Sequence, residues 1–320
     1  MGKRNLFYLK QGLAIGLTAL IVLVFQLPST QSNQHQIYTN DSKSIQSEGL
    51  KFNSSALKSI AKKYSDVEQI SGTELALHKK MVKDIIMNSE LTEANRDQAL
   101  KELGVQKIDN GIETKLASST GNVSMYTPSL SYDSKTKEYI FTGYGLWKDT
   151  DYWNNDVKSD MLLWLQNPAN WKVGKTKNIG GAEAVGIAIT NPSGSTKGLY
   201  VTDGFGFLTS GTDVISSTMV TNDDNNGAAY EPQDKCTLTS FTNYLVAMTA
   251  EWEYNAHSFK TCVNYNSSLS NYNGNAKTFY IHNWNSCKIS NINLGNSGVG
   301  VDLTKESKGW GPAYSTAKPF

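Results

Sequence analysis

The sequence has few cysteines, few histidines and no excess of charge, and each shortage narrows the classes of protein that remain. Its 320 residues include three cysteines and four histidines. Three cysteines cannot build a disulfide scaffold. Lysine and arginine total 30 against 29 acids, which leaves a formal net charge of +1. Because nucleic-acid-binding surfaces need clustered basic residues, this balance predicts no nucleic-acid partner.

The low share of charged residues is accompanied by a normal share of apolar ones. Charged residues make up 18% of the chain and hydrophobic residues 39%. This composition is typical of a folded protein rather than a disordered one. The length alone favours about two domains.

The first 32 residues predict export. Residues 1–11 hold three basic residues and no acid, and 12–27 form an apolar run of 16 residues (GLAIGLTALIVLVFQL) followed by Pro28. A basic flank before such a run is typical of a secretory signal peptide, here with cleavage after Ser32. The alternative is an uncleaved signal anchor, although a spanning helix needs about 20 apolar residues. In either case we expect a secreted or cell-surface protein that contacts a membrane only through this segment.

Helical patterning follows a polar linker. Residues 33–54 are polar and weakly patterned, and 55–122 are predicted to be a helical region. Apolar residues recur every three or four positions over Leu57–Ile70 and again over Leu75–Ile86, which is the spacing of a helix with one apolar face. This region forms either a small bundle beside the main domain or a hairpin that mediates assembly with partners.

Capping residues predict where these helices begin and end. Thr73 is placed to cap the second helix. Thr92 precedes Glu93 and predicts the start of a third, short helix, while Gly104 is suited to end it in the left-handed conformation.

Residues 123–320 predict a mainly β domain. All seven tryptophans and 13 of the 16 tyrosines lie here, in short β-branched and aromatic runs separated by Gly, Asn, Asp, Ser and Pro. Many short strands of this kind favour an antiparallel β-sandwich or jelly roll. In Lys137–Trp147 (KEYIFTGYGLW), Ile140 and Thr142 should share one face of a strand with Tyr144, opposite the neighbouring aromatic residues. The glycines that interrupt this run predict a bulge or bend.

Two carboxylates could support catalysis. Strand alternation places Glu251 and Glu253 on one face, and a retaining glycosidase uses such a pair as nucleophile and acid. The run partly resembles the E-x-D-x-x-E strand of laminarinase-like hydrolases, but Glu253 replaces the Asp and Ala256 the last acid. The alternative is a solvent-facing strand. His257 follows, either as a proton shuttle or as an exposed turn residue.

An acidic loop is a candidate calcium site. Asp223 and Asp224 lie in the loop 222–227, which supplies hard oxygen ligands and ends in glycine. Gln233 stands where an EF-hand loop would have its bidentate Glu. No cofactor is required by the sequence, and calcium is the one candidate ion. Ordinary loop composition is the alternative explanation.

The three cysteines, Cys236, Cys262 and Cys287, follow one another at intervals of about 25 residues. In an oxidising compartment one pair among them could form a disulfide and leave the third unpaired. A zinc site is disfavoured because the close C-x₂₋₄-C step is missing.

Aromatic and polar residues alternate in two segments predicted to be surface loops. Tyr152, Trp153 and Asn155 lie in the first, and Tyr272 and Asn273 in the second. Exposed aromatic rings beside polar side chains can mark a ligand site.

A second aromatic set lies on one predicted strand. His282 would share a face with Tyr280 and Trp284, either as a sugar-binding platform or as sheet packing. Together with export, the aromatic loops favour non-catalytic binding of a carbohydrate or other surface polymer. A glycoside hydrolase using Glu251 and Glu253, and a structural exoprotein assembling through its helices, are the alternatives.

Overall fold

The computed structural model describes sixteen stretches of the chain: residues 5–9, 21–25, 54–88, 90–108, 116–120, 123–147, 161–209, 214–216, 219–223, 226–244, 247–254, 257–282, 289–295, 298–303, 310–315 and 317–320. Within them the protein is mainly β with antiparallel sheets, as the sequence predicts. The predicted cleavage site after Ser32 lies outside the described residues. No helix in the described stretches is long and apolar enough to cross a membrane.

Three helices precede the main sheets. They are α1 (Ser54–Lys63), α2 (Gly72–Met87) and α3 (Glu93–Glu102). The apolar pattern predicts that the first helix continues to Ile70, but α1 ends at Lys63. A turn that contains Ser65 and Asp66 follows it. The second begins before Thr73, so that residue does not cap it.

The predicted ends of α3 are confirmed. The Thr92 side chain accepts a hydrogen bond from the Asn95 amide at 3.2 Å and so caps the first turn. Gly104 has a φ of +92°, the left-handed conformation that ends a helix at little cost for glycine. Local sequence signals therefore set both ends of this helix.

The largest sheet has the order β10-β9-β15-β6-β5-β3, with β4 pairing β5. Its strands are β3 (Val105–Lys107), β4 (Leu116–Thr120), β5 (Val123–Asp133), β6 (Glu138–Trp147), β9 (Val201–Thr209), β10 (Val214–Ser216) and β15 (Ser258–Tyr265). Two of them, β3 and β4, fall within the predicted helical region 55–122. The β structure therefore begins earlier in the chain than the predicted boundary.

A second sheet has the order β11-β12-β8-β16-β19, with β20 pairing β16. Its strands are β8 (Ala184–Gly194), β11 (Met219–Asp223), β12 (Gly227–Tyr230), β16 (Tyr272–His282), β19 (Trp310–Tyr314) and β20 (Lys318–Pro319). A separate two-stranded sheet pairs β17 (Ile289–Gly295) with β18 (Gly298–Leu303).

The two large sheets pack face to face through a shared apolar core. Phe141 of β6 lies in this core with Ile187 of β8 and Tyr230 of β12. Across the interface, the ring of Phe259 from β15 stacks on that of Tyr280 from β16, with centroids 4.1 Å apart. This two-layer arrangement fits the predicted β-sandwich.

Alternation along β6 is confirmed, and the predicted bulge or bend occurs at the first of its two glycines, Gly143. A Cβ on Gly143 would lie 2.4 Å from the hydroxyl of Thr278 on the facing strand β16, and one on Gly145 would lie 2.2 Å from the ring of Phe259. Both distances are shorter than a side chain could tolerate. These glycines therefore provide room for neighbouring side chains, and the register shift of β5 and β6, between Tyr126 and Ser129 on β5, lies opposite Gly143 of β6.

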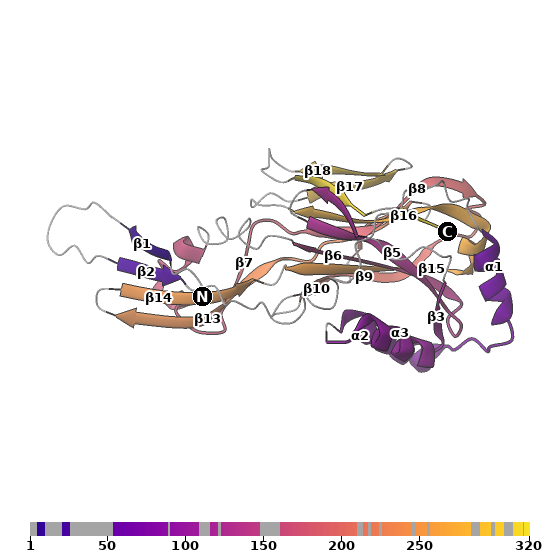
Figure 1. The fold of residues 1–320 in the computed structure, drawn as a ribbon, viewed down its shortest axis with the longest axis horizontal. Coiled ribbons are helices and arrows are strands. Elements are labelled where there is room, and N and C mark those ends of the chain that lie inside the picture. Colours follow the sequence, from indigo (N-terminus) through magenta and orange to yellow (C-terminus); the bar gives the residue numbers. More distant parts are fainter. Residues whose placement is uncertain are drawn as a thin grey trace.

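A third sheet forms an arm at one end of the two packed sheets (Figure 1). Its order is β1-β2-β14-β13-β7, and all its pairings are antiparallel except that of β2 with β14. The strands are β1 (Asn5–Leu9), β2 (Ile21–Phe25), β7 (Thr176–Asn178), β13 (Lys235–Tyr244) and β14 (Ala247–Tyr254).

Helices α2 and α3 cover the outer face of the largest sheet (Figure 1). Val82, Ile86 and Leu100 from these helices pack against Phe205 and Cys262 of that face. Burial of these side chains stabilises the docking by about 1.5–3 kcal/mol for each fully buried aliphatic residue. The predicted bundle beside the main domain is therefore attached directly to the sheet.

Candidate functional site

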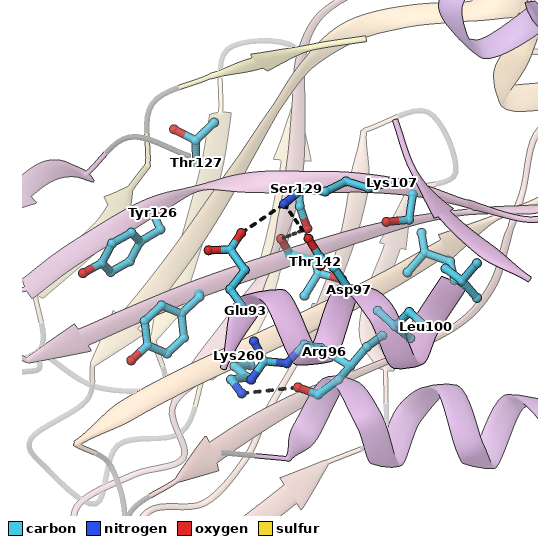
Figure 2. A pocket seen from close by; sticks show the side chains of 15 residues that line it. Glu93, Arg96, Asp97, Leu100, Lys107, Tyr126, Thr127, Ser129, Thr142 and Lys260 are labelled. Atoms are coloured by element: carbon cyan, nitrogen blue, oxygen red, sulfur yellow. Dashed lines mark hydrogen bonds and ion pairs between the residues drawn. The ribbon is translucent and has the colours of Figure 1, made fainter. Parts of the chain in front are cut away.

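A cavity of about 240 Å³ lies between α3 and the outer face of the sheet formed by β3, β5, β6 and β15 (Figure 2). Its lining combines apolar, hydroxyl, aromatic and charged side chains: Ile86, Glu93, Arg96, Asp97, Leu100, Val105, Lys107, Tyr126, Thr127, Ser129, Ser131, Ile140, Thr142, Tyr144 and Lys260. Small-molecule pockets in proteins usually have volumes of about 300–1,000 Å³, so this one is suited to a single ring or a similarly small group.

An irregularity in β5 brings its polar side chains into the cavity. Tyr126 pairs with Tyr144 and Ser129 pairs with Thr142, so β5 has one more residue than β6 between these two pairs. Pro128 occupies this irregular step, where a residue without an amide hydrogen is tolerated. The shift places Tyr126 and Ser129 on the same lining even though they are three residues apart.

The two tyrosines form an aromatic pair at the cavity. The centroids of the Tyr126 and Tyr144 rings are 5.2 Å apart and the ring planes are tilted by 37°. On the next strand Lys260 is the cross-strand partner of Tyr144. Two aromatic rings and an ammonium group therefore lie in a row across β5, β6 and β15.

Lys260 is 6% exposed and supports the C-terminal end of α2. Its Nζ donates a hydrogen bond to the backbone oxygen of Ile86 at 3.3 Å, in the last turn of that helix. A cation at this end interacts favourably with the helix dipole and with carbonyls that have no intrahelical partner. The same residue thus lines the cavity and docks the helix.

Lys107 holds two acids at the rim of the cavity. Its Nζ lies 3.0 Å from the Glu93 carboxylate and 3.1 Å from that of Asp97 (Figure 2). Burial acts to lower the pKa of Lys107, but hydrogen bonding and attraction from Glu93 and Asp97 outweigh it and raise the pKa above 10.5. The three groups therefore form a charged cluster with both donors and acceptors near the cavity.

Arg96 adds a donor from α3. Its Nη2 donates to the backbone oxygens of Asn88 and Leu91 at 2.9 and 3.0 Å. Its Nε is buried and has no hydrogen-bond partner among the described residues. These contacts fix the guanidinium at the cavity wall.

The arrangement is suited to binding a polar ring rather than to acid–base chemistry. Serine and threonine hydroxyls can donate or accept, the carboxylates accept, and the tyrosine faces offer apolar contact. Glu93 and Asp97 share one ammonium group, which suits them as fixed hydrogen-bond acceptors. The polar groups can fix the orientation of a small ligand.

No protein-family model and no curated protein matches the chain.

The predicted catalytic pair lies on the arm. Glu251 and Glu253 are on β14, where Trp252 and Tyr254 on the opposite face are buried and the two glutamates are partly exposed. The two glutamates share one face of β14, as strand alternation predicts. Neither glutamate lines the cavity below α3.

The predicted ligand loops divide between described and undescribed residues. Tyr152, Trp153 and Asn155 lie outside the described residues. Tyr272 and Asn273 do not form a surface loop, because they begin β16 and pair with residues of β8. The Tyr272 ring is 2% exposed and packs near Phe320, so it lacks the open face that the prediction assumed.

The predicted calcium loop is only partly described. Asp223 ends β11, opposite Gly227 in the β11–β12 hairpin, and Asp224 lies outside the described residues. Calcium binding there stays a prediction.

The predicted disulfide does not involve the two described cysteines. Cys236 and Cys262 are buried thiols that form no disulfide, and Cys287 lies outside the described residues. The Cys262 Sγ instead donates to the side-chain oxygen of Asn264 at 3.2 Å. Burial is the main cause that raises the pKa of the Cys262 thiol, which keeps it protonated at neutral pH.

The structure reveals a second polar cluster that the sequence does not disclose. Glu183, Asp234 and His282 are buried, and their donor atoms all lie within 4.8 Å of one another. The sequence predicts that His282 shares a strand face with Tyr280 and Trp284; the Tyr280 ring is its neighbour, whereas Trp284 lies outside the described residues. The two acids are separated from it by about 50 residues or more, so no local motif could have linked them.

Proposed function

We propose that this protein is an exported, non-catalytic binding protein that recognises a carbohydrate or a similar surface polymer. The proposed binding site is the cavity below α3, on the outer face of a β-sandwich. We propose this cavity in place of the predicted contact residues Tyr272 and Asn273, whose positions in β16 are unsuited to ligand binding. Export is proposed from the N-terminal sequence, with the protein secreted or held at the cell surface.

The observation that carries this proposal is the Tyr126–Tyr144 pair beside a row of hydroxyl and charged groups in one cavity. Aromatic faces contact the C–H surface of a sugar ring, and neighbouring polar groups can hydrogen-bond its hydroxyls. The volume of about 240 Å³ suits one sugar residue of a longer polymer. Because the lining contains both acids and bases, a neutral or zwitterionic sugar suits it better than a highly charged one.

The test is binding of the purified protein to insoluble polysaccharides and cell walls, followed by titration with soluble fragments of any polymer that depletes it. Tyr144→Ala removes one ring of the pair, and we expect the Kd to rise at least about tenfold, equivalent to about 1.4 kcal/mol. Tyr200→Ala is the matched control, since Tyr200 is 51% exposed and does not line the cavity.

The proposal fails if no polymer depletes the protein, or if Tyr144→Ala binds as well as the Tyr200→Ala control. Sugar released into the same supernatants, and lost in Glu253→Gln, would favour the hydrolase alternative instead. Absence of both binding and release would favour a structural exoprotein. In that case Leu77 and Met81, which are exposed on α2, would be the first candidates for an assembly contact.

A further inference from the structure

Three polar side chains meet where the arm joins the two packed sheets. Glu183 immediately precedes β8, His282 ends β16, and Asp234 immediately precedes β13 of the arm. Their exposed fractions are 0%, 2% and 0%, respectively. Three separate segments of the chain therefore bring an imidazole and two carboxylates into one buried site.

Hydrogen bonds hold the two acid-bearing segments together. The Glu183 amide donates to the Pro232 carbonyl oxygen at 3.1 Å, and the Ile179 amide donates to the Asp234 carbonyl oxygen at 3.1 Å. The Gln233 side chain donates to the Asp234 carboxylate at 2.9 Å. These contacts fix the backbone that presents both carboxylates.

Aromatic rings orient the groups further. His282 packs against Trp147, with ring centroids 5.1 Å apart at an interplanar angle of 80°, and its Nδ1 lies 2.7 Å from the Glu183 carboxylate. The Tyr254 hydroxyl donates to the other oxygen of Asp234 at 2.8 Å. Such outer contacts are the kind that orient metal ligands in proteins.

The charges at this site are unbalanced. Two carboxylates face one imidazole, which can supply at most one positive charge. When both acids are ionised, a bound cation would offset the negative charge that the imidazole leaves uncompensated, and so relieve the cost of burying two carboxylates.

We propose that Glu183, Asp234 and His282 bind a structural divalent metal ion of the zinc type, which fastens the β13–β14 arm to the two packed sheets. Zinc takes imidazole nitrogen and carboxylate oxygen at about 2.0–2.2 Å, commonly in a tetrahedral site. Donor atoms within 4.8 Å of one another can converge on such an ion after movements of about an ångström. The Tyr254 hydroxyl donates a hydrogen bond to Asp234. It therefore lies near enough either to compete with the ion for that carboxylate oxygen or to act as a further ligand.

The direct test is metal content. The full-length protein, freed of any affinity tag, is loaded with ZnCl₂, dialysed against metal-free buffer and analysed by atomic emission. We expect about one zinc per chain, a Tm that falls on chelation, and faster amide hydrogen exchange in β13 and β14 of the chelated protein. Cobalt substitution should give the visible absorption bands of a tetrahedral nitrogen–oxygen site.

Variants assign the metal to these residues. Glu183→Gln and His282→Gln should each lower retained zinc at least tenfold and make the Tm insensitive to chelator. Glu251→Gln is the matched control, because it neutralises a partly exposed glutamate on β14 and should keep the zinc. If a Glu183 variant does not fold, Tyr254→Phe provides the second measurement: it leaves the three ligands in place and should retain zinc while altering the cobalt spectrum.

Three outcomes overturn the proposal. One is retention of less than about 0.1 zinc per chain with a Tm that neither zinc nor chelator changes. Another is equal zinc retention by Glu183→Gln, His282→Gln and the Glu251→Gln control. A third is a cobalt spectrum typical of thiolate ligands, which would move the metal to the cysteines.

Discussion

His257 should make the protein less stable in weak acid, and the size of the effect follows from its surroundings. His257 immediately precedes β15. Its carbonyl oxygen accepts a hydrogen bond from the Trp147 amide at 3.0 Å, and its ring packs near that of Tyr254. Burial lowers the pKa of His257 from 6.5 to about 4. The folded protein therefore favours the neutral imidazole.

The direction of the stability change depends on whether the folded or the unfolded chain binds the proton more tightly. The unfolded chain takes up a proton on His257 near pH 6.5, whereas the folded chain does so only near pH 4. The stability contributed by this residue is complete above pH 6.5 and is lost as the pH falls toward 4. One pKa unit corresponds to about 1.4 kcal/mol, so the loss reaches about 2 kcal/mol at pH 5 and about 3 kcal/mol at pH 4 as an upper bound.

The assay is urea unfolding monitored by tryptophan fluorescence between pH 7.5 and pH 4, with the unaltered protein and His257→Gln compared at each pH. Other acids titrate equally in both proteins, so the difference between the two curves isolates His257. We expect this difference to change by about 2 kcal/mol between pH 7.5 and pH 5, in favour of the variant at low pH. Parallel curves, or an imidazole NMR titration centred near pH 6.5, would refute the reasoning.

Three further substitutions test the packing and capping of the fold. Gly143→Ala should lower the free energy of unfolding by about 1–3 kcal/mol in urea titrations, because its Cβ would overlap the Thr278 hydroxyl. Thr92→Ala should lower the free energy of unfolding by about 1 kcal/mol, because it removes the hydrogen bond to the Asn95 amide. Thr92→Ser keeps a hydroxyl that can accept this bond and should retain most of that stability. Leu57→Ala should cost about 2–5 kcal/mol and speed hydrogen exchange in α1, since the Leu57 side chain is fully buried.

Features set by neighbours in the chain could be predicted from the sequence. The caps of α3 depend on Thr92 and Gly104, each acting within one turn, and the sequence predicts both. The two faces of β6 follow from strand alternation alone, and the mainly β character follows from the density of short β-branched and aromatic runs. In these cases the physical cause lies within a few residues of its effect.

Features set by pairing between distant segments could not be predicted in the same way. The Asn-rich stretch after Asn271 has the composition of a loop, yet it forms the start of β16 because Tyr272 and Asn273 pair with Gly194 and Ser193 of β8. Pairing with a neighbouring strand overrides such weak local preferences. The Tyr272 ring is consequently buried between the sheets rather than presented to solvent.

The cavity below α3 depends on contacts that span a still longer part of the chain. Lys107, Tyr144 and Lys260 reach it from β3, β6 and β15. The irregular step at Pro128 turns Tyr126 and Ser129 toward the same space, and strict alternation would have placed them on opposite faces. A sequence pattern could identify these residues only after the order and register of the strands were known.

Ionic contacts recur where separate elements of this fold are joined. His78 and Asp133 pair at 2.7 Å between α2 and the end of β5, and Lys79 and Glu138 pair at 2.8 Å between α2 and β6. Each of these joints brings together one acid and one basic group. The joint between the arm and the two packed sheets differs, because two acids there meet a single imidazole. Since an apolar contact could join these elements without that electrostatic cost, the cation proposed above would account for the extra acid.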